Sequence, residues 1–143
     1  MRNLLLLLAG VALPALAAPQ GEMFHDPGCG CCGKWAQHMQ AGQLPLQSQA
    51  RQDMAALKRQ LGVPATLQSC HTARIGGYLI EGHVPAAVVQ RLLREKPAVA
   101  GLAVAGMPIG SPGMEGAIRQ PYQVMAFTRD GRQYVYASIA GDR

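Results

Sequence analysis

Cys29-Gly30-Cys31-Cys32-Gly33 holds three of the four cysteines of this 143-residue chain. The fourth, Cys70, stands directly before His71. Neighbouring cysteines such as Cys31 and Cys32 fit the geometry of a disulfide poorly, so the three clustered thiols cannot all pair with one another. Either some of them reach Cys70, or all four converge on a soft metal ion or on a redox partner.

A short strand is predicted before the cysteine segment and a helix after it. The strand covers residues 21–25, and Lys34 to Ala41 forms the helix, which ends at Gly42. A helix that begins beside the thiols stabilises thiolates, because its amino end is positively polarised and has free backbone N–H groups. The spacing from Cys29 to Cys32 is the C-x-x-C of thioredoxin-like redox motifs, here with a further cysteine inside it.

The remaining elements are predicted from periodicity and turn residues. They are, in chain order, a weak edge strand over 44–48, a helix over 51–61, a hairpin of strands 72–75 and 78–80, a helix that opens at Pro85 and ends at Pro97, and a second hairpin of strands 122–128 and 133–139. Gly76-Gly77 is the signature of a two-residue hairpin turn, and Asp130-Gly131 marks the second hairpin. Residues 97–121 are rich in Gly, Pro, Ala and Met, and we expect an ordered loop over 107–116.

This order of elements predicts an α/β fold with a single thioredoxin-like domain. A βαβ unit comes first, with the thiols in the turn after its first strand, and a β-hairpin and a helix follow. A Gly/Pro/Met loop and a C-terminal β-hairpin complete the chain. The length suits one domain, and an apolar content of 49% is enough to fill one core.

The first seventeen residues have the features of a secretory signal. Arg2 provides a positive start, an apolar run begins at Leu4, and Ala15-Leu16-Ala17 is a small-x-small cleavage site. The apolar run is too short to remain as a membrane anchor. We therefore expect a signal peptide over 1–17 and a mature domain over 18–143, exported to the periplasm and without a membrane span.

Export changes the interpretation of charge and cysteines. The formal net charge is +5, and removal of Arg2 leaves +4. The basic residues are scattered rather than clustered with aromatics, so the charge indicates a solvated surface and no nucleic-acid partner. In an oxidising compartment, four cysteines form two disulfides by default, and this alternative competes with any metal site.

Three uses of the thiols stay open on residue types alone. A disulfide scaffold would pair Cys29 with Cys32 and Cys31 with Cys70. A thiol–disulfide oxidoreductase would use Cys29 as the attacking thiolate and Cys32 as the resolving thiol, although two more thiols nearby would interfere with a clean exchange. A metal site would use all four sulfurs.

Copper is the metal that this thiol pattern favours. Thiolates select soft ions, Cu(I) or zinc. Zinc sites usually take their sulfurs from two spaced C-x-x-C pairs, which this chain lacks, so zinc fits poorly. Crowded thiolates that each bridge two metal ions suit a multinuclear Cu(I) cluster. Four thiolates and about four Cu(I) ions would also leave a partly buried cluster near neutral.

Histidines and methionines near the thiols are candidate accessory ligands. His71 adjoins Cys70, and His25 closely precedes the cysteine segment. Met107 and Met114 lie in the Gly/Pro loop, and thioethers bind Cu(I). Two other histidines are expected elsewhere: His38 in a surface or packing role, and His83 beside the start of the following helix.

Long motifs in the chain resemble a family labelled for a long time as a domain of unknown function, whose best-understood members are the periplasmic copper-resistance proteins called CopG. The motifs are Asp26-Pro27-Gly28-Cys29-Gly30-Cys31-Cys32-Gly33-Lys34-Trp35 with His38-Met39, Leu61-Gly62-Val63-Pro64, Ser69-Cys70-His71-Thr72, Gly82-His83-Val84-Pro85, Gly106-Met107-Pro108 and Gly110-Ser111-Pro112-Gly113-Met114-Glu115. The resemblance covers nearly all of the mature chain. Residues 44–49 and 117–120 match the family less well.

The resemblance implies a thioredoxin-like fold and a copper site. In this family the cysteines bridge a multinuclear copper cluster, which implies Cys29, Cys31, Cys32 and Cys70 as copper ligands here. The resemblance also implies a role in copper resistance beside copper exporter components, and an oxidoreductase that interconverts Cu(I) and Cu(II). A passive copper-binding or delivery module with the same ligands remains an alternative.

Overall fold

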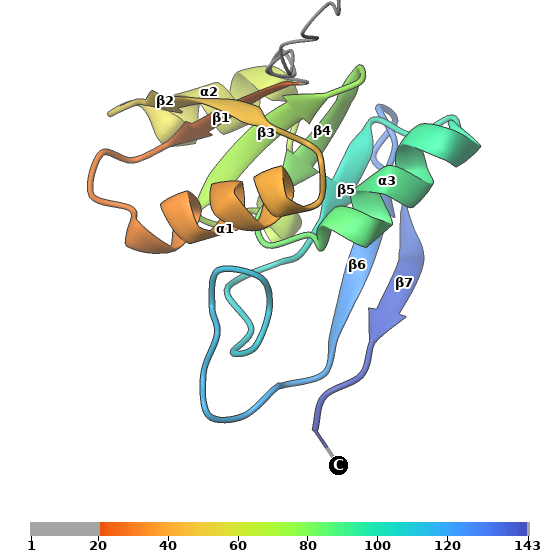
Figure 1. The fold of residues 1–143 in the computed structure, drawn as a ribbon. Helices are drawn as coiled ribbons and strands as arrows, with labels where there is room; N and C mark the ends of the chain where they lie inside the picture. Colours follow the sequence, from red (N-terminus) through yellow and green to blue (C-terminus); the bar gives the residue numbers. More distant parts are fainter. Residues whose placement is uncertain (1–20, 143) are drawn as a thin grey trace, which may run out of the picture.

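A computed structural model describes residues 21–142, which form one seven-stranded sheet with three α-helices (Figure 1). The strands are β1 (Gly21–His25), β2 (Leu46–Ala50), β3 (His71–Ile75), β4 (Tyr78–Glu81), β5 (Gly101–Ala103), β6 (Tyr122–Phe127) and β7 (Gln133–Ile139). The helices are α1 (Gly30–Ala41), α2 (Met54–Leu61) and α3 (Ala86–Glu95), and a 3₁₀ turn covers Ala65–Leu67. In residues 21–142 no helix has both the length and the apolar character to cross a bilayer. The predicted signal peptide lies outside the described residues.

The sheet has the strand order β2-β1-β3-β4-β5-β6-β7. β1 pairs in parallel with β2 and antiparallel with β3, so the first three strands and α1 form the expected βαβ unit followed by a hairpin strand. Helix α3 connects β4 to β5, which pairs with it in parallel. The antiparallel hairpin of β6 and β7 then extends the sheet beyond β5, and β7 forms its second edge. The predicted thioredoxin-like α/β fold is therefore confirmed, and β2 lies at the edge of the sheet as predicted, directly after Pro45.

Successive strand residues point to opposite faces of the sheet and so separate its two apolar layers. Met23 packs into the main core with Trp35 of α1 and Leu92 of α3, on the side where Figure 1 shows these two helices. Its neighbour Phe24 points to the other face and packs on Met54 and Leu57 of α2. The main core is thus shared by α1 and α3, and α1 carries the cysteines.

The β3–β4 hairpin has the register that its two glycines dictate. Gly76 and Gly77 both have positive φ, +57° and +85°, as a two-residue turn requires. Paired residues therefore have numbers that add up to 153, from Ile75 opposite Tyr78 to Thr72 opposite Glu81. The register continues beyond the strands, where the Gly82 N–H donates to the His71 carbonyl oxygen at 3.0 Å.

Two elements differ from the sequence prediction. α1 begins at Gly30 rather than near Lys34, so Cys31 and Cys32 lie in its first turn and Cys29 is its N-cap residue. Burial of Cys32 and Trp35 in the main core extends the helix across residues with weak intrinsic helix preference. β5 was not predicted, because a fully buried strand of three residues shows no polar–apolar alternation.

The loop between β5 and β6 packs against the start of α1. Gly113 of this loop is buried with φ +87°, and a Cβ atom placed there would lie 2.7 Å from the Cys31 carbonyl oxygen and 3.0 Å from the Trp35 amide nitrogen. The helix segment that carries Cys31 therefore needs glycine at this contact.

Gly113→Ala is expected to destabilise the protein more than Gly131→Ala. Gly131 also has φ +87°, but no atom lies within 4 Å of the place that its Cβ would take, so it carries the conformational cost of about 1–2 kcal/mol without the clash. Gly113→Ala has the same conformational cost, and its new Cβ atom must in addition push the loop away from α1. Urea denaturation of both metal-free variants measures the difference, and equal losses would show that the loop does not depend on this contact.

Candidate metal centre

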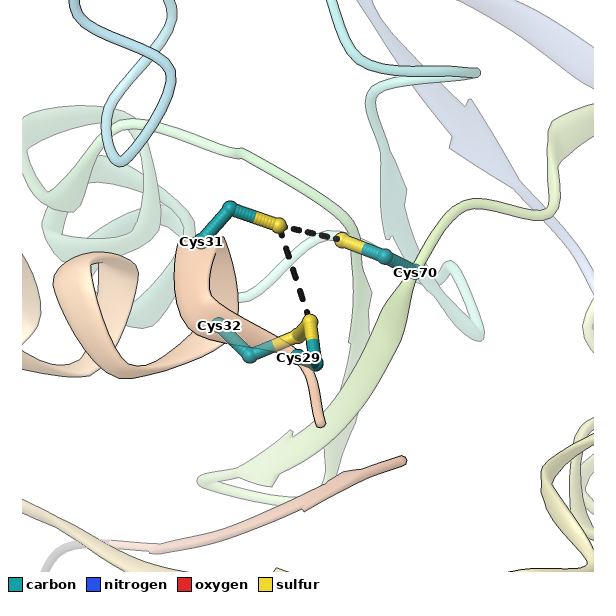
Figure 2. A group of neighbouring side chains, drawn as sticks. All are labelled: Cys29, Cys31, Cys32 and Cys70. Atoms are coloured by element: carbon teal, nitrogen blue, oxygen red, sulfur yellow. Dashed lines mark hydrogen bonds between the residues drawn. A yellow bond between two sulfur atoms is a disulfide. The ribbon is translucent and has the colours of Figure 1, made fainter. Parts of the chain in front are cut away.

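Four sulfur atoms from two distant chain segments meet at the amino end of α1 (Figure 2). Cys31 Sγ lies 3.5 Å from Cys29 Sγ and 3.7 Å from Cys70 Sγ. One ligand atom from each of the four cysteines falls within 4.8 Å of the others. The expectation that Cys70 folds against the other three cysteines is therefore confirmed.

The structure contains one disulfide and two free thiols. Cys29 and Cys32 are joined, while Cys31 and Cys70 are free and half-buried. The two-disulfide scaffold is therefore realised only in part, since its second pair lies side by side without a bond. The Cys29–Cys32 bond across the first turn of a helix is the arrangement that the C-x-x-C spacing predicted.

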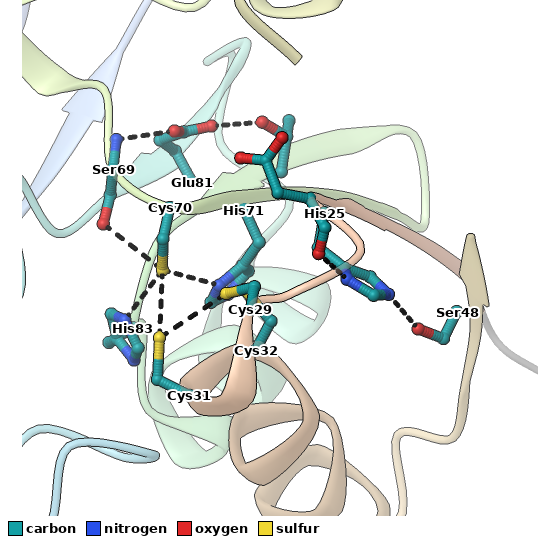
Figure 3. The surroundings of a disulfide bond; sticks show 12 residues. His25, Cys29, Cys31, Cys32, Ser48, Ser69, Cys70, His71, Glu81 and His83 are labelled. Carbon is teal, nitrogen blue, oxygen red and sulfur yellow. Dashed lines mark hydrogen bonds between the residues drawn. A yellow bond between two sulfur atoms is a disulfide. The ribbon is translucent and has the colours of Figure 1, made fainter. Parts of the chain in front are cut away.

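Strand pairing explains why Cys70 arrives beside α1. β3 is antiparallel to β1, and His71 at its start faces His25 at the end of β1. The chain leaves β1 through Asp26 and enters α1 four residues later, so the start of β3 and the start of α1 lie at the same end of the sheet. Cys70, one residue before β3, therefore points toward the first turn of α1 (Figure 3).

His83 belongs to this centre, contrary to the prediction that it only neighbours a helix start. Its side chain is buried, and its Nε2 lies 3.0 Å from Cys70 Sγ. The β3–β4 register shows why, since Cys70 and His83 are a further pair whose numbers add up to 153. The two-residue turn at Gly76-Gly77 was the sequence signal that could have identified this contact.

The hydrogen bond of His83 Nδ1 leaves Nε2 as the ring nitrogen that can bind a metal ion or accept a proton. Its Nδ1 lies 2.7 Å from the Pro112 carbonyl oxygen, which can only accept a hydrogen bond, so Nδ1 carries the proton. Burial lowers the pKa of His83, which favours the neutral ring. A neutral ring with a proton on Nδ1 has a free lone pair on Nε2, directed at Cys70.

His71 also faces the sulfurs, as its position beside Cys70 suggested. Its Nδ1 lies 3.3 Å from Cys70 Sγ, and its ring packs on Trp35 with a centroid distance of 4.3 Å. The side chain is buried, and its Nε2 has no hydrogen-bond partner among the described residues. Burial, with His83 and Lys58 nearby, lowers the pKa of His71 well below its ordinary value and keeps it neutral.

The other accessory candidates differ in their relation to the centre. His25 is engaged away from it, with Nδ1 2.8 Å from the Asp26 carbonyl oxygen and Nε2 2.7 Å from the Ser48 hydroxyl. Met107 is 52% exposed, so much of its side chain faces solvent. Met114 is half-buried and lines a hollow of about 380 Å³ together with Cys31. Met114 is therefore the methionine with a direct route to a free thiol.

His38 has a packing role, as expected. Its Nε2 accepts a hydrogen bond of 3.0 Å from the Ala86 N–H, at the first residue of α3. This contact joins the two helices of the main core and supplies a partner for an amide that the helix leaves free. Burial lowers the pKa of His38, consistent with a neutral acceptor.

The site favours neutral Cys70 in the absence of metal. Burial and the neighbouring Cys31 raise the pKa of Cys70 to about 12. The amino end of α1, by contrast, favours negative charge beside it, since no acidic residue occupies its first turn and no side chain caps it. A cation that binds here would thus displace the Cys70 proton to the solvent.

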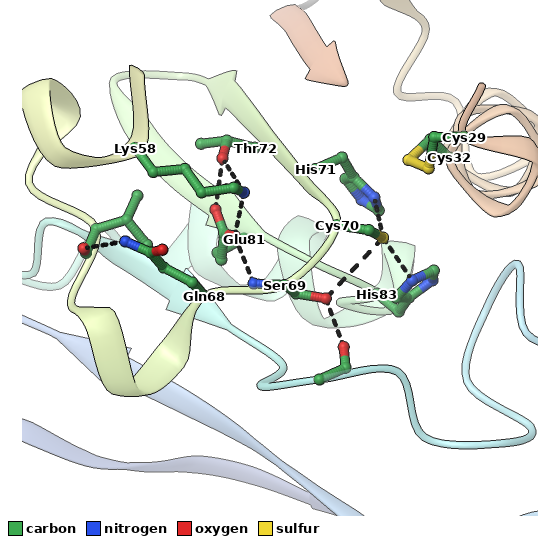
Figure 4. Close-up of polar contacts among 12 residues, drawn as sticks. Cys29, Cys32, Lys58, Gln68, Ser69, Cys70, His71, Thr72, Glu81 and His83 are labelled. Carbon is green, nitrogen blue, oxygen red and sulfur yellow. Dashed lines mark hydrogen bonds and ion pairs between the residues drawn. A yellow bond between two sulfur atoms is a disulfide. The ribbon is translucent and has the colours of Figure 1, made fainter. Parts of the chain in front are cut away.

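A buried ionic network holds the backbone just before Cys70 (Figure 4). The fully buried Glu81 accepts hydrogen bonds from Lys58 Nζ at 2.5 Å, from the Thr72 hydroxyl at 2.5 Å and from the Ser69 N–H at 2.7 Å. Burial raises the pKa of Glu81, and these three donors oppose that shift. Because this carboxylate fixes the Ser69 amide, it also fixes the direction in which the Cys70 side chain points from the backbone.

The fold and the sulfur cluster define an α/β protein of thioredoxin-like strand order with a cysteine-rich centre that could bind metal. Comparison with known proteins agrees. Two solved structures named copper resistance protein CopG, forms 1 and 2, are each 44% identical to this chain. Form 1 covers 83% of this chain and 95% of its own, with a TM-score of 0.78, and form 2 covers 84% and 97%, with a TM-score of 0.80.

The chain belongs to the CopG family of copper resistance proteins. The family profile described as "Protein of unknown function, DUF411" matches residues 67–114, a segment that includes Cys70, His71 and His83. No curated protein sequence gives a significant match. The family and the cysteine group together support a function that involves copper.

The raised pKa of Cys70 predicts a slow, strongly pH-dependent alkylation. In metal-free Cys31→Ser, Cys70 is the single free thiol and burial, the main cause of its raised pKa, remains. Only the thiolate reacts, so the iodoacetamide rate should rise about tenfold per pH unit from about pH 7 to about pH 9. Mass spectrometry follows the reaction. A rate that reaches a plateau within this range would contradict the raised pKa.

Cys70→Ser provides the matched control, because it leaves Cys31 as the single free thiol. Cys31 lines the open hollow, and we expect it to react faster than Cys70 at neutral pH.

Proposed function

We propose that this protein binds copper in the periplasm and protects against copper excess, through a cysteine-bridged multinuclear Cu(I) cluster held by Cys29, Cys31, Cys32 and Cys70. The observation that carries the proposal is the convergence of four sulfurs, from segments some forty residues apart, within 4.8 Å. Export through the signal over 1–17 is part of the proposal, and copper exporter components are its expected partners.

The donor set suits copper. Sulfur and imidazole nitrogen are the ligands that Cu(I) prefers over hard oxygen donors, and no carboxylate belongs to either grouped set of the described residues. His83 Nε2 and His71 Nδ1, which lie 3.0 Å and 3.3 Å from Cys70 Sγ, add neutral nitrogen donors at the rim of the sulfurs. Trp35 and the core behind it keep water away from this side.

Full occupancy needs the Cys29–Cys32 bond to open. Cleavage takes two electrons and two protons from a dithiol reductant, which itself becomes a disulfide. The four thiols then lose their protons as copper binds, and about four Cu(I) ions would balance the four thiolates. Before all of these ions are bound, the amino end of α1 would stabilise the thiolates that are not yet balanced.

We further propose that the protein interconverts Cu(I) and Cu(II). Copper supplies a one-electron couple when it is bound. The chain contributes soft ligands that favour Cu(I), neutral imidazoles that also suit Cu(II), and a hollow beside Cys31 through which ions and electron partners can approach. Passive binding with the same ligands is the alternative within the copper function.

The disulfide itself favours a second candidate function, that of a thiol–disulfide oxidoreductase. Cys29 stands at the N-cap position of α1, where the helix dipole would stabilise its thiolate and activate it for attack. Against a simple exchange enzyme, Cys31 lies 3.5 Å from Cys29 Sγ and would compete with Cys32 as resolving thiol.

Copper stoichiometry tests the cluster. Fully reduced protein, titrated anaerobically with Cu(I) against a chromophoric chelator, should bind several ions per chain, about four by charge balance. Cys31→Ser should lower this number, because Cys31 Sγ lies close to both Cys29 and Cys70. His25→Ala is the matched control and should leave the number unchanged, since both ring nitrogens have other partners.

Saturation of the reduced wild type at one copper ion would refute the cluster. An unchanged count in Cys31→Ser would remove its bridging role.

A turnover assay separates oxidoreduction from passive binding. Protein at a small fraction of the copper concentration should accelerate the oxidation of Cu(I) by dioxygen, in proportion to the protein added. A passive binder can protect only its own stoichiometric share of copper and would give no added rate. An exchange enzyme, in turn, would reduce disulfide substrates without metal and would be insensitive to Cys70→Ser.

A further inference from the structure

We propose that Cys31, Cys70 and His83 form a Cu(I) site of their own, which stays available while Cys29 and Cys32 are joined in the disulfide. The inference rests on the proposed copper function and deepens it, because it assigns a distinct ligand set to the oxidised protein. This set would hold a single ion. Disulfide closure would then reduce the copper capacity of the protein without abolishing it.

The two free thiols have the separation that one ion can span. Two sulfurs bound to the same ion at about 2.3 Å each lie at most about 4.6 Å apart. Cys31 Sγ and Cys70 Sγ are 3.7 Å apart in the disulfide-closed chain, so both can reach a shared ion with little movement. The closed pair cannot offer thiolates, so these two sulfurs are the anionic donors left.

His83 supplies the third ligand in the right protonation state. The Pro112 carbonyl oxygen accepts the Nδ1 proton and so leaves the Nε2 lone pair free. Nε2 lies 3.0 Å from Cys70 Sγ, where the thiol now donates to it. An ion that replaces this thiol proton would meet the sulfur and the nitrogen together. A carbonyl that orients a histidine in this way is the usual partner of a metal-binding imidazole.

His71 is less well prepared than His83. Its Nδ1 also faces Cys70 Sγ, but its Nε2 has no hydrogen-bond partner among the described residues, so nothing fixes which nitrogen carries the proton. Its ring is held against Trp35 instead. We therefore assign the nitrogen ligand to His83.

The site has an approach from solvent. Cys31 lines the hollow that Gly113, Met114 and Glu115 close on the loop side. An incoming Cu(I) ion can reach Cys31 without passing the disulfide. Two thiolates and one Cu(I) ion leave a single negative charge, which lies at the positively polarised start of α1.

Copper titration of the untreated, disulfide-closed protein tests the proposal. Under anaerobic conditions and without reductant, it should bind one Cu(I) ion per chain against a chromophoric chelator, and mass spectrometry should find the disulfide intact afterwards. X-ray absorption should show two sulfur ligands and one nitrogen ligand. The Cys29→Ser/Cys32→Ser double variant, which cannot close the disulfide, should also bind one ion.

Two single substitutions in that double variant identify the ligands. His83→Ala should weaken Cu(I) binding at least about tenfold, the lower end of what even an indirect partner of a metal ligand contributes. Cys31→Ser should abolish chelator-resistant binding. His25→Ala is again the matched control, with no change expected, because its Nε2 is bonded to the Ser48 hydroxyl.

The outcomes separate this proposal from the cluster. No binding by the disulfide-closed protein, or one ion whose affinity and nitrogen ligand survive His83→Ala, would overturn the site, whatever the reduced protein binds. Several ions in the reduced protein would leave the cluster intact in that case. One ion in the closed protein and no more after reduction would support the site and refute the cluster.

Discussion

The centre depends on how β3 pairs with its two neighbours. β3 lies between β1 and β4 and is antiparallel to both, so its first residue lies beside the last residues of those strands. The cysteine segment follows β1, His83 follows β4, and Cys70 precedes β3. One pairing pattern therefore brings three chain segments to one end of the sheet. A slip of one residue would turn Cys70 toward the opposite face.

The buried carboxylate of Glu81 holds the backbone beside Cys70 in position, but its burial removes the carboxylate from water, which costs free energy of folding. A buried ion pair is weak evidence for stability, because the two charges lose their hydration. Here Lys58, Thr72 and the Ser69 amide together satisfy the carboxylate, and they belong to α2, β3 and the segment before β3. The pair thus joins the far layer of the sheet to the backbone of Cys70. Its value lies in orientation, which an apolar pair could not supply to a backbone N–H.

Much of this structure could be predicted from the sequence. β1, the two hairpins and α3 were found because their turn glycines and apolar periodicity are local signals. The four-cysteine group was predicted from the crowding of three thiols in one segment and from the resemblance to the copper-resistance family. β5 was missed, because its burial is produced by strands on either side rather than by its own pattern.

The contact of His83 with Cys70 shows what a local view overlooks. A histidine before a helix-starting proline suggests a helix neighbour, and that prediction was incomplete, because the ring also contacts Cys70 Sγ. The tight turn had already fixed the register of the hairpin, so the long-range pair could have been counted from Gly76-Gly77. The redox state of the thiols is different, because the sequence favoured the pairs Cys29–Cys32 and Cys31–Cys70 but could not show which of the two forms a bond.

The oxidation state of Cys29 and Cys32 connects all the functions considered for this centre. The same two sulfurs cannot be a disulfide and metal-bridging thiolates at once, so copper and oxidants would compete for them under the proposed function. Copper that binds the dithiol form stabilises that form by mass action, to an extent that grows with its free concentration. An oxidising compartment would act in the opposite direction and favour the disulfide form of Cys29 and Cys32. Cys31 and Cys70 lie outside the competition as long as they stay unpaired, and the carbonyl of Pro112 keeps His83 directed at them. The balance between copper supply and thiol oxidation, rather than any change of fold, would then set how much copper the protein holds.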